Sequence, residues 1–350
     1  MTPLLTYHQQ QGTTLDLANN TVLSFGTDDD IMAALETGLV VGDRSHWGLI
    51  KFTGADRQRY LHNQSTNQIQ LLQPGQSCET VLVNSTARTL DLANIHIFKD
   101  ELWVMVSPSK TDFLMAWFDR FLFPMDKVEI SDITAEYSKL TLMGATAIAQ
   151  LQSLVAEELQ TFPEGGHQWL TIDDTKILCA TGSGLTVKGL TLFIPAEAAV
   201  EIWQKIITLG AVPMGEQAWG KLRIHQGRPA ADQELTEDYN PLEAGLWRCV
   251  SFDKGCYIGQ EAIARLNTYK GVKQRLFGVK LTAPVEPGTK LTVDGERAGV
   301  ITSIDLEENF ALGYVRTKMG GAGLTVTAGE ATGEVVAVPY VSHEYPEPIA

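Results

Sequence analysis

The sequence changes character near residue 272, where short apolar segments begin to alternate with tight-turn residues. Pro-Gly, Asp-Gly and Gly-Gly pairs separate several of these segments, and such pairs favour turns. The segments lie at residues 275–281, 289–293, 296–303, 310–316, 324–328 and 334–341. This pattern predicts a small all-β domain of about six strands, a barrel or a sandwich, over residues 272–350.

The first 271 residues instead mix helical and strand patterns. Apolar spacing and capping residues predict helices at 28–38, 55–63, 110–123, 145–160, 196–209 and 219–225, with strands between them. The order is irregular, which indicates an α+β fold rather than a repeated βαβ series. A chain of 350 residues usually needs more than one core, so we expect two or three domains and a boundary near Gly271.

Charge and cysteine content narrow the functional classes. The net charge of -15 argues against broad nonspecific binding to nucleic acid or to anionic membranes. The four cysteines form no C-x-x-C pair, so neither a zinc site nor a disulfide framework is expected. The N-terminus lacks a signal-peptide pattern, and no apolar run approaches the roughly 20 residues of a membrane span. These observations favour a cytoplasmic protein without a metal site.

The segment KGCYIGQE, Lys254 to Glu261, is the strongest candidate for a functional site. The preceding residues alternate as in a strand, Asp253-Lys254-Gly255 has turn chemistry, and a helical pattern starts after Gly259. Cys256 is then expected in a tight loop before a helix N-terminus and near a lysine, two features that favour a thiolate. The alternative is a buried cysteine that acts as a small hydrophobic residue.

Basic residues accumulate around this segment. Between positions 248 and 280 the only acids are Asp253 and Glu261, whereas the bases are Arg248, Lys254, Arg265, Lys270, Lys273, Arg275 and Lys280. The net charge of this stretch is therefore positive, whereas that of the whole chain is negative. We therefore predict a site for a phosphate, a ligand carboxylate or an RNA backbone, with a solvated surface as the alternative.

KGCYIGQE resembles the K-G-C-Y-x-G-Q-E signature of the YgfZ family, the folate-binding relatives of the glycine-cleavage T-protein. The resemblance extends along most of the chain. NPLEAGL (240–246) precedes the signature as in the family, LIKFTGADRQRYLHN (49–63) resembles its N-terminal segment, and ERAGVITS (296–303) resembles part of its C-terminal barrel. The family fold implies two mixed α/β lobes over residues 1–271, split near residue 137, and a β-barrel over 272–350.

The resemblance implies a protein that binds tetrahydrofolate or a one-carbon derivative and supports assembly or repair of iron–sulfur enzymes. Its functional residues correspond to Lys254 and Cys256. Tyr257 would border the ligand, and Gln260 and Glu261 would fix the loop. Glu243 is a candidate partner for the pterin edge, with a helix N-terminal acid as the alternative. Candidates for the anionic folate tail are Arg223 and the basic stretch from Arg265 onward.

Positions that bind ligand in the T-protein differ in this chain. Its N-x-x-G-G-x-x-D-D segment corresponds to residues 84–92, where the double glycine is absent and Asp91 is the acid that remains. Its folate-binding glutamates are replaced by His225 and Val187. These departures argue against aminomethyl transfer. A one-carbon transferase that uses Asp91 remains the enzymatic alternative, and a tRNA-modification factor, disfavoured by the acidic chain, is the third.

Overall fold

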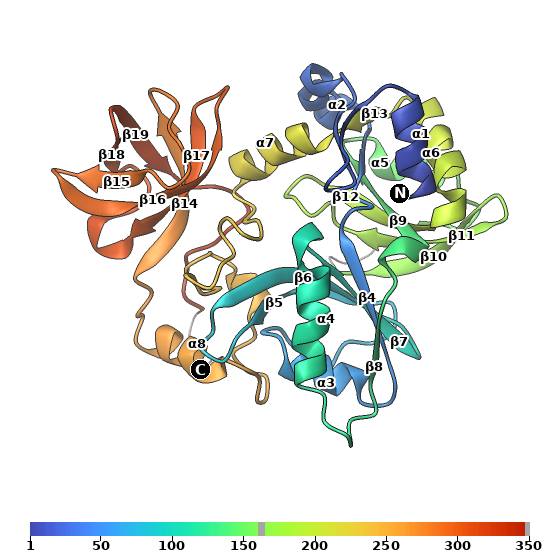
Figure 1. Cartoon of the computed structure of the whole chain (residues 1–350), viewed down its shortest axis with the longest axis horizontal. Helices are drawn as coiled ribbons and strands as arrows, with labels where there is room; N and C mark the ends of the chain where they lie inside the picture. The colour runs from blue at the N-terminus through green and yellow to red at the C-terminus, as the bar shows by residue number, and fades with distance from the viewer. Residues whose placement is uncertain (160–164, 347–350) are drawn as a thin grey trace. The chain divides into compact units, whose positions relative to one another are not determined.

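The computed structural model describes residues 1–159 and 165–346 of the chain (Figure 1). Within these residues the fold is α+β, as predicted, and no helix is long and apolar enough to cross a membrane. The α-helices are α1 (Pro3–Gln10), α2 (Ile31–Thr37), α3 (Arg57–Asn63), α4 (Thr111–Arg120), α5 (Ala147–Gln152), α6 (Ala199–Thr208), α7 (Glu216–Gln226) and α8 (Gln260–Thr268).

The strands form three larger sheets and one hairpin. The hairpin pairs β1 (Thr14–Asp16) with β2 (Thr21–Ser24). One sheet has the order β10 (His167–Ile172), β11 (Thr175–Thr181), β12 (Gly189–Pro195), β9 (Tyr137–Met143), β3 (Val40–Asp43), β13 (Val212–Met214). Another has the order β5 (Ser77–Val83), β6 (Thr89–Ile97), β7 (Glu101–Val106), β4 (Gly48–Thr53), β8 (Glu129–Asp132).

The third sheet closes into the C-terminal barrel, drawn in orange to red in Figure 1. Its order is β14 (Gln274–Leu281), β17 (Phe310–Arg316), β16 (Glu296–Asp305), β15 (Lys290–Val293), β18 (Thr325–Ala328), β19 (Ala331–Val336). Side chains such as Val279, Ile301 and Ala311 share one buried cluster. The predicted six-stranded β region is therefore confirmed and is a barrel rather than a sandwich.

The chain divides into two compact units. Unit 1 comprises residues 1–57, 71–78 and 94–220, and unit 2 comprises residues 58–70, 79–93 and 221–350. Strands β5 and β6 begin in one unit and end in the other. Unit 2 holds the barrel together with two segments from the first hundred residues. The boundary near Gly271 and the lobe division near residue 137 stay predictions.

Strand β12 shows how unit 1 builds its core. Its side chains alternate in direction, so Leu192 and Ile194 join a cluster with Trp203 of α6, whereas Phe193 joins a second cluster with Trp103 of β7. Both faces of the strand are thus covered. This explains why the run Leu192–Ile194 is apolar at every position rather than alternating.

Two predicted elements differ from the structure. The helix expected at 145–160 is limited to α5 (Ala147–Gln152) among the described residues, and position 160 lies outside them. The strand expected before KGCYIGQE is a 3₁₀ turn, Trp247–Cys249. Its residues alternate because Trp247 and Cys249 are buried in two different hydrophobic clusters, not because they line a sheet.

Candidate functional site

Lys254 anchors the predicted functional loop to a segment much earlier in the chain. Its ammonium group donates hydrogen bonds to the backbone carbonyls of His62 (2.6 Å), Ser65 (2.6 Å) and Asn67 (2.7 Å). An ammonium group has three N–H donors, so these carbonyls can use all of them. An anion would have to displace one of the carbonyls to bind this charge.

The imidazole of His62, whose backbone carbonyl accepts from Lys254, is held in its neutral form. Burial, reinforced by the nearby Lys254 charge, lowers the pKa of His62 to about 4. Its Nδ1 accepts hydrogen bonds from the backbone N–H groups of Ile69 (3.4 Å) and Gln70 (3.3 Å), which requires an unprotonated nitrogen. The segment 62–70 therefore turns around a neutral imidazole and presents its carbonyl groups to Lys254.

Gly259 fixes the other end of the loop. Its φ of +80° lies in the left-handed region that favours glycine, and it is the N-cap of α8. A β-carbon at this position would lie 2.7 Å from the carbonyl oxygen of Asn84 and 3.0 Å from Cα of Ala87. The backbone N–H of Ile258 also donates to the carbonyl of Asn63 at 2.9 Å. The loop is thus fastened on both sides of Cys256.

Tyr257 and Gln260 complete the internal structure of the loop. The Gln260 side-chain oxygen accepts a hydrogen bond from the Tyr257 backbone N–H at 2.9 Å. The Lys254 ammonium lies 4.6 Å from the centre of the Tyr257 ring, a distance suited to a cation–π contact. Burial raises the pKa of the Tyr257 hydroxyl to about 12, so it is protonated at neutral pH. Glu261 is exposed in the first turn of α8.

Cys256 is the exposed cysteine of the chain. Cys179 and Cys249 are buried, and Cys78 is partly buried. Burial raises the pKa of the Cys179 thiol to about 12, which makes it inert at neutral pH. The predicted alternative of a buried hydrophobic cysteine therefore does not describe Cys256, which is exposed in a loop whose flanking residues are held in place.

Asp91 lies on β6, fully buried at 0% exposure. The turn before it is built by Asn84, whose side-chain oxygen accepts from the backbone N–H groups of Thr86 and Arg88, each at 3.0 Å. Ala87 has a φ of +60° in this turn, at a position where the T-protein segment has glycine. The turn thus keeps a glycine-like conformation although the double glycine is absent.

Glu243 takes part in a reciprocal capping arrangement. Its carboxylate accepts from the Asn240 backbone N–H at 3.1 Å, and the Asn240 side-chain oxygen accepts from the Glu243 N–H at 3.0 Å. The carboxylate also lies 3.6 Å from the Arg88 guanidinium. Burial raises the pKa of Glu243 above its ordinary value, while the Asn240 hydrogen bond and Arg88 oppose that shift. The geometry accounts for a local structural role of this acid.

Arg223 lies in a buried polar network rather than at an open anion site. Its guanidinium group forms an ion pair with Glu234 at 3.0 Å and donates to the Ser303 hydroxyl at 2.8 Å and to the Gln233 side chain. Arg223 and Glu234 are 8% and 0% exposed. No sequence pattern indicates this network, because its members lie as far apart as positions 223 and 303.

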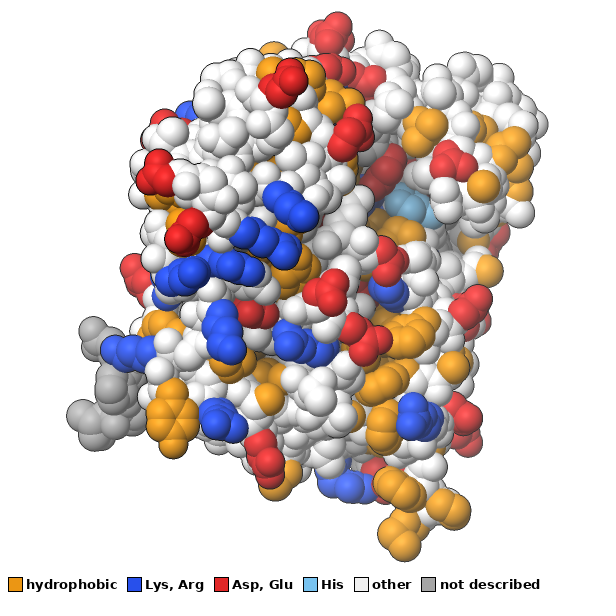
Figure 2. All heavy atoms as spheres, turned by 60° about the vertical axis from the view of Figure 1, so that its left-hand side comes forward, with side chains coloured by type: hydrophobic (Ala, Val, Ile, Leu, Met, Phe, Trp, Pro, Cys, Tyr) orange, Lys and Arg blue, Asp and Glu red, His pale blue; other side chains and the backbone are white. Residues whose placement is uncertain are grey.

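Arg265 is exposed on α8, and the predicted basic stretch continues beyond it. In the barrel, Gln274 of β14 pairs with Arg316 of β17, so this second arginine lies beside the stretch that contains Lys273 and Arg275. Figure 2 shows Lys and Arg side chains gathered on one face. The local excess of bases seen in the sequence is therefore joined by Arg316 from the neighbouring strand β17.

A family model described as the GCVT N-terminal domain matches residues 24–254. A chloroplastic protein of Arabidopsis thaliana, named provisionally as a transferase, is 43% identical over 330 residues, which cover 93% of this chain and 76% of the relative. An aminomethyltransferase of Halalkalibacterium halodurans is 27% identical over 361 residues, which cover 97% of each chain.

The fold is also similar to a solved structure. The crystal structure of glycine cleavage system aminomethyltransferase T from Bartonella henselae superposes with a TM-score of 0.85, at 20% identity, over 98% of each chain. At this identity the similarity establishes the fold alone. It confirms the T-protein-like architecture that the sequence predicted.

Proposed function

Because the chain belongs to the family defined by the GCVT N-terminal domain, we propose that it binds tetrahydrofolate or a one-carbon derivative and supports iron–sulfur cluster assembly or repair. We assign it to the YgfZ type within this family on the KGCYIGQE signature. Its partners would be folate and iron–sulfur client or assembly proteins in the cytoplasm, although the Arabidopsis relative is named as chloroplastic.

The exposure of Cys256 is the observation that carries this proposal. Contacts of Lys254, Gln260 and Gly259 hold the loop in place, and Cys256 is exposed within it. A thiol displayed in this way is accessible to a metal cluster, an oxidised client or a second thiol. Lys254 would then act by positioning Cys256 through the loop, because its ammonium group is already bound to carbonyls.

The remaining candidates would serve the folate. Tyr257 and Glu261 would border the ligand, and the exposed Arg265 would attract its anionic tail. Glu243 and Arg223 would act with them, although both carry internal contacts that a ligand must share or replace. The excess of bases near α8 suits a tail of glutamate carboxylates.

The proposal is tested by calorimetric titration of the protein with tetrahydrofolate, followed by rescue of a strain that lacks the gene. Cys256→Ala should keep the folate affinity of the parent within about threefold and should fail to rescue. Cys78→Ala is the matched control and should rescue. Rescue by Cys256→Ala removes the thiol role, whereas failure of the parent to bind folate removes the folate role.

Aminomethyl or other one-carbon transfer is the second candidate, because the aminomethyltransferase of Halalkalibacterium halodurans matches the chain along its length. Asp91 would be the acid beside the folate. Turnover with an aminomethyl or methylene donor that is lost in Asp91→Asn would favour this function. Absence of turnover in a parent protein that binds folate would favour the accessory role.

A further inference from the structure

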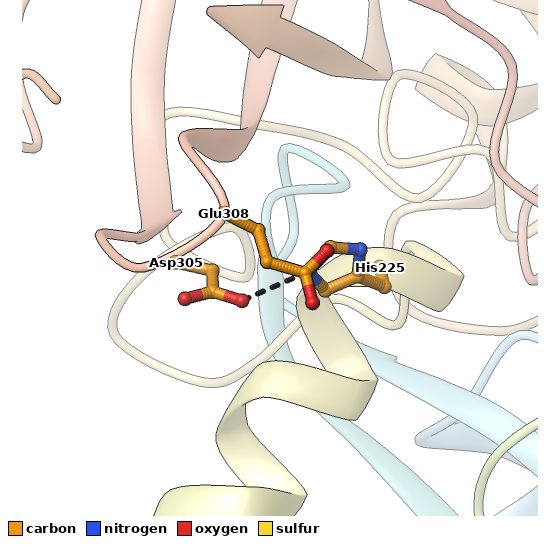
Figure 3. A group of neighbouring side chains, drawn as sticks. All are labelled: His225, Asp305 and Glu308. Carbon is orange, nitrogen blue, oxygen red and sulfur yellow. Dashed lines mark hydrogen bonds and ion pairs between the residues drawn. The ribbon is translucent and has the colours of Figure 1, made fainter. Parts of the chain in front are cut away.

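A histidine and two carboxylates converge in unit 2, outside the KGCYIGQE segment. His225 lies in the last turn of α7, whereas Asp305 and Glu308 lie at the turn between β16 and β17 (Figure 3). The His225 Nε2 atom is 2.9 Å from Asp305 Oδ2 and 3.7 Å from Glu308 Oε2. One ligand atom from each residue lies within 4.8 Å of the other two.

The spacing suits a small metal ion. Two ligands bound to Zn²⁺ at about 2.0–2.1 Å in tetrahedral geometry are separated by about 3.3 Å. The distances of 2.9 Å and 3.7 Å from His225 Nε2 lie on either side of this value. Measured from His225, both carboxylates thus lie within a few tenths of an ångström of the spacing that zinc requires.

Neighbouring groups orient two of the three side chains. The His225 ring stacks on Phe310, with ring centres 4.5 Å apart and planes inclined by 18°. Asp305 has a side chain only 2% exposed, and its Oδ1 accepts from the Glu307 backbone N–H at 3.0 Å. Its other oxygen, Oδ2, is thereby directed at His225. Outer contacts of this kind orient the ligands in metal sites.

The local charge also favours a cation. The turn between the two strands carries three acids, Asp305, Glu307 and Glu308. Lys221, one helical turn before His225, pairs with Glu307 at 2.5 Å. This pair neutralises the nearby ammonium group and leaves the other two carboxylates facing the imidazole of His225.

We propose that His225, Asp305 and Glu308 bind a divalent transition-metal ion, with Zn²⁺ as the expected occupant and a water molecule as the fourth ligand. An imidazole with two carboxylates is a donor set that suits zinc, and the nitrogen disfavours Mg²⁺. The ion replaces the proton shared by His225 and Asp305, so one proton is released or moves to His225 Nδ1. The bound ion clamps the end of α7 to the β16–β17 turn. This inference is independent of the proposed function.

The test uses calorimetric titration with Zn²⁺ on the full chain carrying Cys256→Ser, which removes the exposed thiol as a competing ligand. We expect saturable binding of one ion per chain. His225→Ala and Glu308→Gln, added to this background, should each weaken binding by about tenfold or more. Glu307→Gln is the matched control in the same turn and should bind within about threefold of the parent. Mg²⁺ at millimolar concentration should not compete.

A second readout covers the case in which His225→Ala fails to fold. Zn²⁺ should raise the melting temperature of the parent, because a ligand that binds the folded state stabilises it. The rise should shrink in Glu308→Gln, whose side chain is 72% exposed in the parent and therefore dispensable for packing. The proposal is overturned if the parent binds no Zn²⁺ stoichiometrically, if Glu308→Gln binds as tightly as the parent, or if Mg²⁺ competes equally.

Discussion

The Lys254 ammonium group lies 2.6 Å from the carbonyl oxygen of His62, a residue 192 positions earlier in the sequence. Together with the hydrogen bonds to Ser65 and Asn67, this contact joins the KGCYIGQE loop to the segment 62–67 through one charged side chain. The sequence suggests that Lys254 binds a ligand, whereas in the structure Lys254 holds the loop that carries Cys256.

Replacing Lys254 by methionine should destabilise unit 2. The substitution keeps much of the aliphatic chain but leaves three carbonyl groups without their charged donor. Hydrogen bonds to charged groups contribute about 1.5–3 kcal/mol each, and they are not additive, so we expect a total loss of about 3 kcal/mol. Denaturant unfolding measures it. The exposed Lys270, changed in the same way, should cost less than about 0.5 kcal/mol. Equal effects of the two substitutions contradict the anchoring role.

Gly259→Ala should distort the loop. The new methyl group meets the Asn84 carbonyl oxygen at 2.7 Å, and the φ of +80° is unfavourable for alanine. The conformational term alone costs about 1–2 kcal/mol, and the clash adds to it. Gly255→Ala, in the same loop, is the control, because nothing lies within 4 Å of its added carbon. Comparison of the two unfolding free energies checks the expectation, which fails if both variants are as stable as the parent.

Thiol-reactive probes should distinguish the cysteines. In the native protein, a maleimide should label Cys256 first, because its side chain is exposed. Cys179 and Cys249, at 0% and 1% exposure, should react only after unfolding. Peptide mass spectrometry of timed samples gives each rate. Labelling of Cys179 as fast as Cys256 in folded protein is incompatible with the structure.

Acid should destabilise unit 1 through two buried histidines. The Nδ1 atoms of His96 and His167 each lie 2.8 Å from the Ser77 hydroxyl. Burial, with the neighbouring His167, lowers the pKa of His96 to about 3, and burial lowers that of His167 to about 4. Both are about 6.5 in an unfolded chain.

Below pH 6.5 the unfolded chain therefore binds more protons than the folded one. The free energy of unfolding is therefore at its full value above this pH. It falls as the pH falls toward 4, by as much as about 1.4 kcal/mol per pH unit for each histidine. Unfolding free energies between pH 7 and pH 4.5 measure the slope. His96→Gln combined with His167→Gln should make it shallower, with the part due to other buried histidines such as His62 remaining, and an unchanged slope would exclude His96 and His167 as contributors.

Local sequence patterns predicted the barrel well because its strands are short, regular and separated by strong turn pairs. Gly259 also behaved as its sequence context suggested, as the residue before a helix. The role of Lys254 could not be predicted in this way. Its partners are backbone carbonyls. Because every residue has one, the amino-acid sequence does not indicate which carbonyls Lys254 contacts.

The same reasoning explains the other differences. Arg223 looked like an anion-binding residue, since sequence gives no indication that Glu234 and Ser303 would surround it. The sequence does not indicate that His225 has a carboxylate partner, because Asp305 lies 80 positions away on a barrel strand. Contacts between distant segments follow from the tertiary fold, whereas the periodicity of apolar residues predicts only local secondary structure.

Unit 2 consists of residues 58–70, 79–93 and 221–350, and this has a consequence for synthesis of the protein. At about 5–20 residues per second, Lys254 is made on the order of ten seconds or more after the carbonyl groups that it binds. During that interval apolar residues such as Val81 and Leu92 lack their final neighbours. These apolar residues therefore stay uncovered by their native partners until residues 221–350 have been made, and no contiguous fragment can be expressed as unit 2 alone.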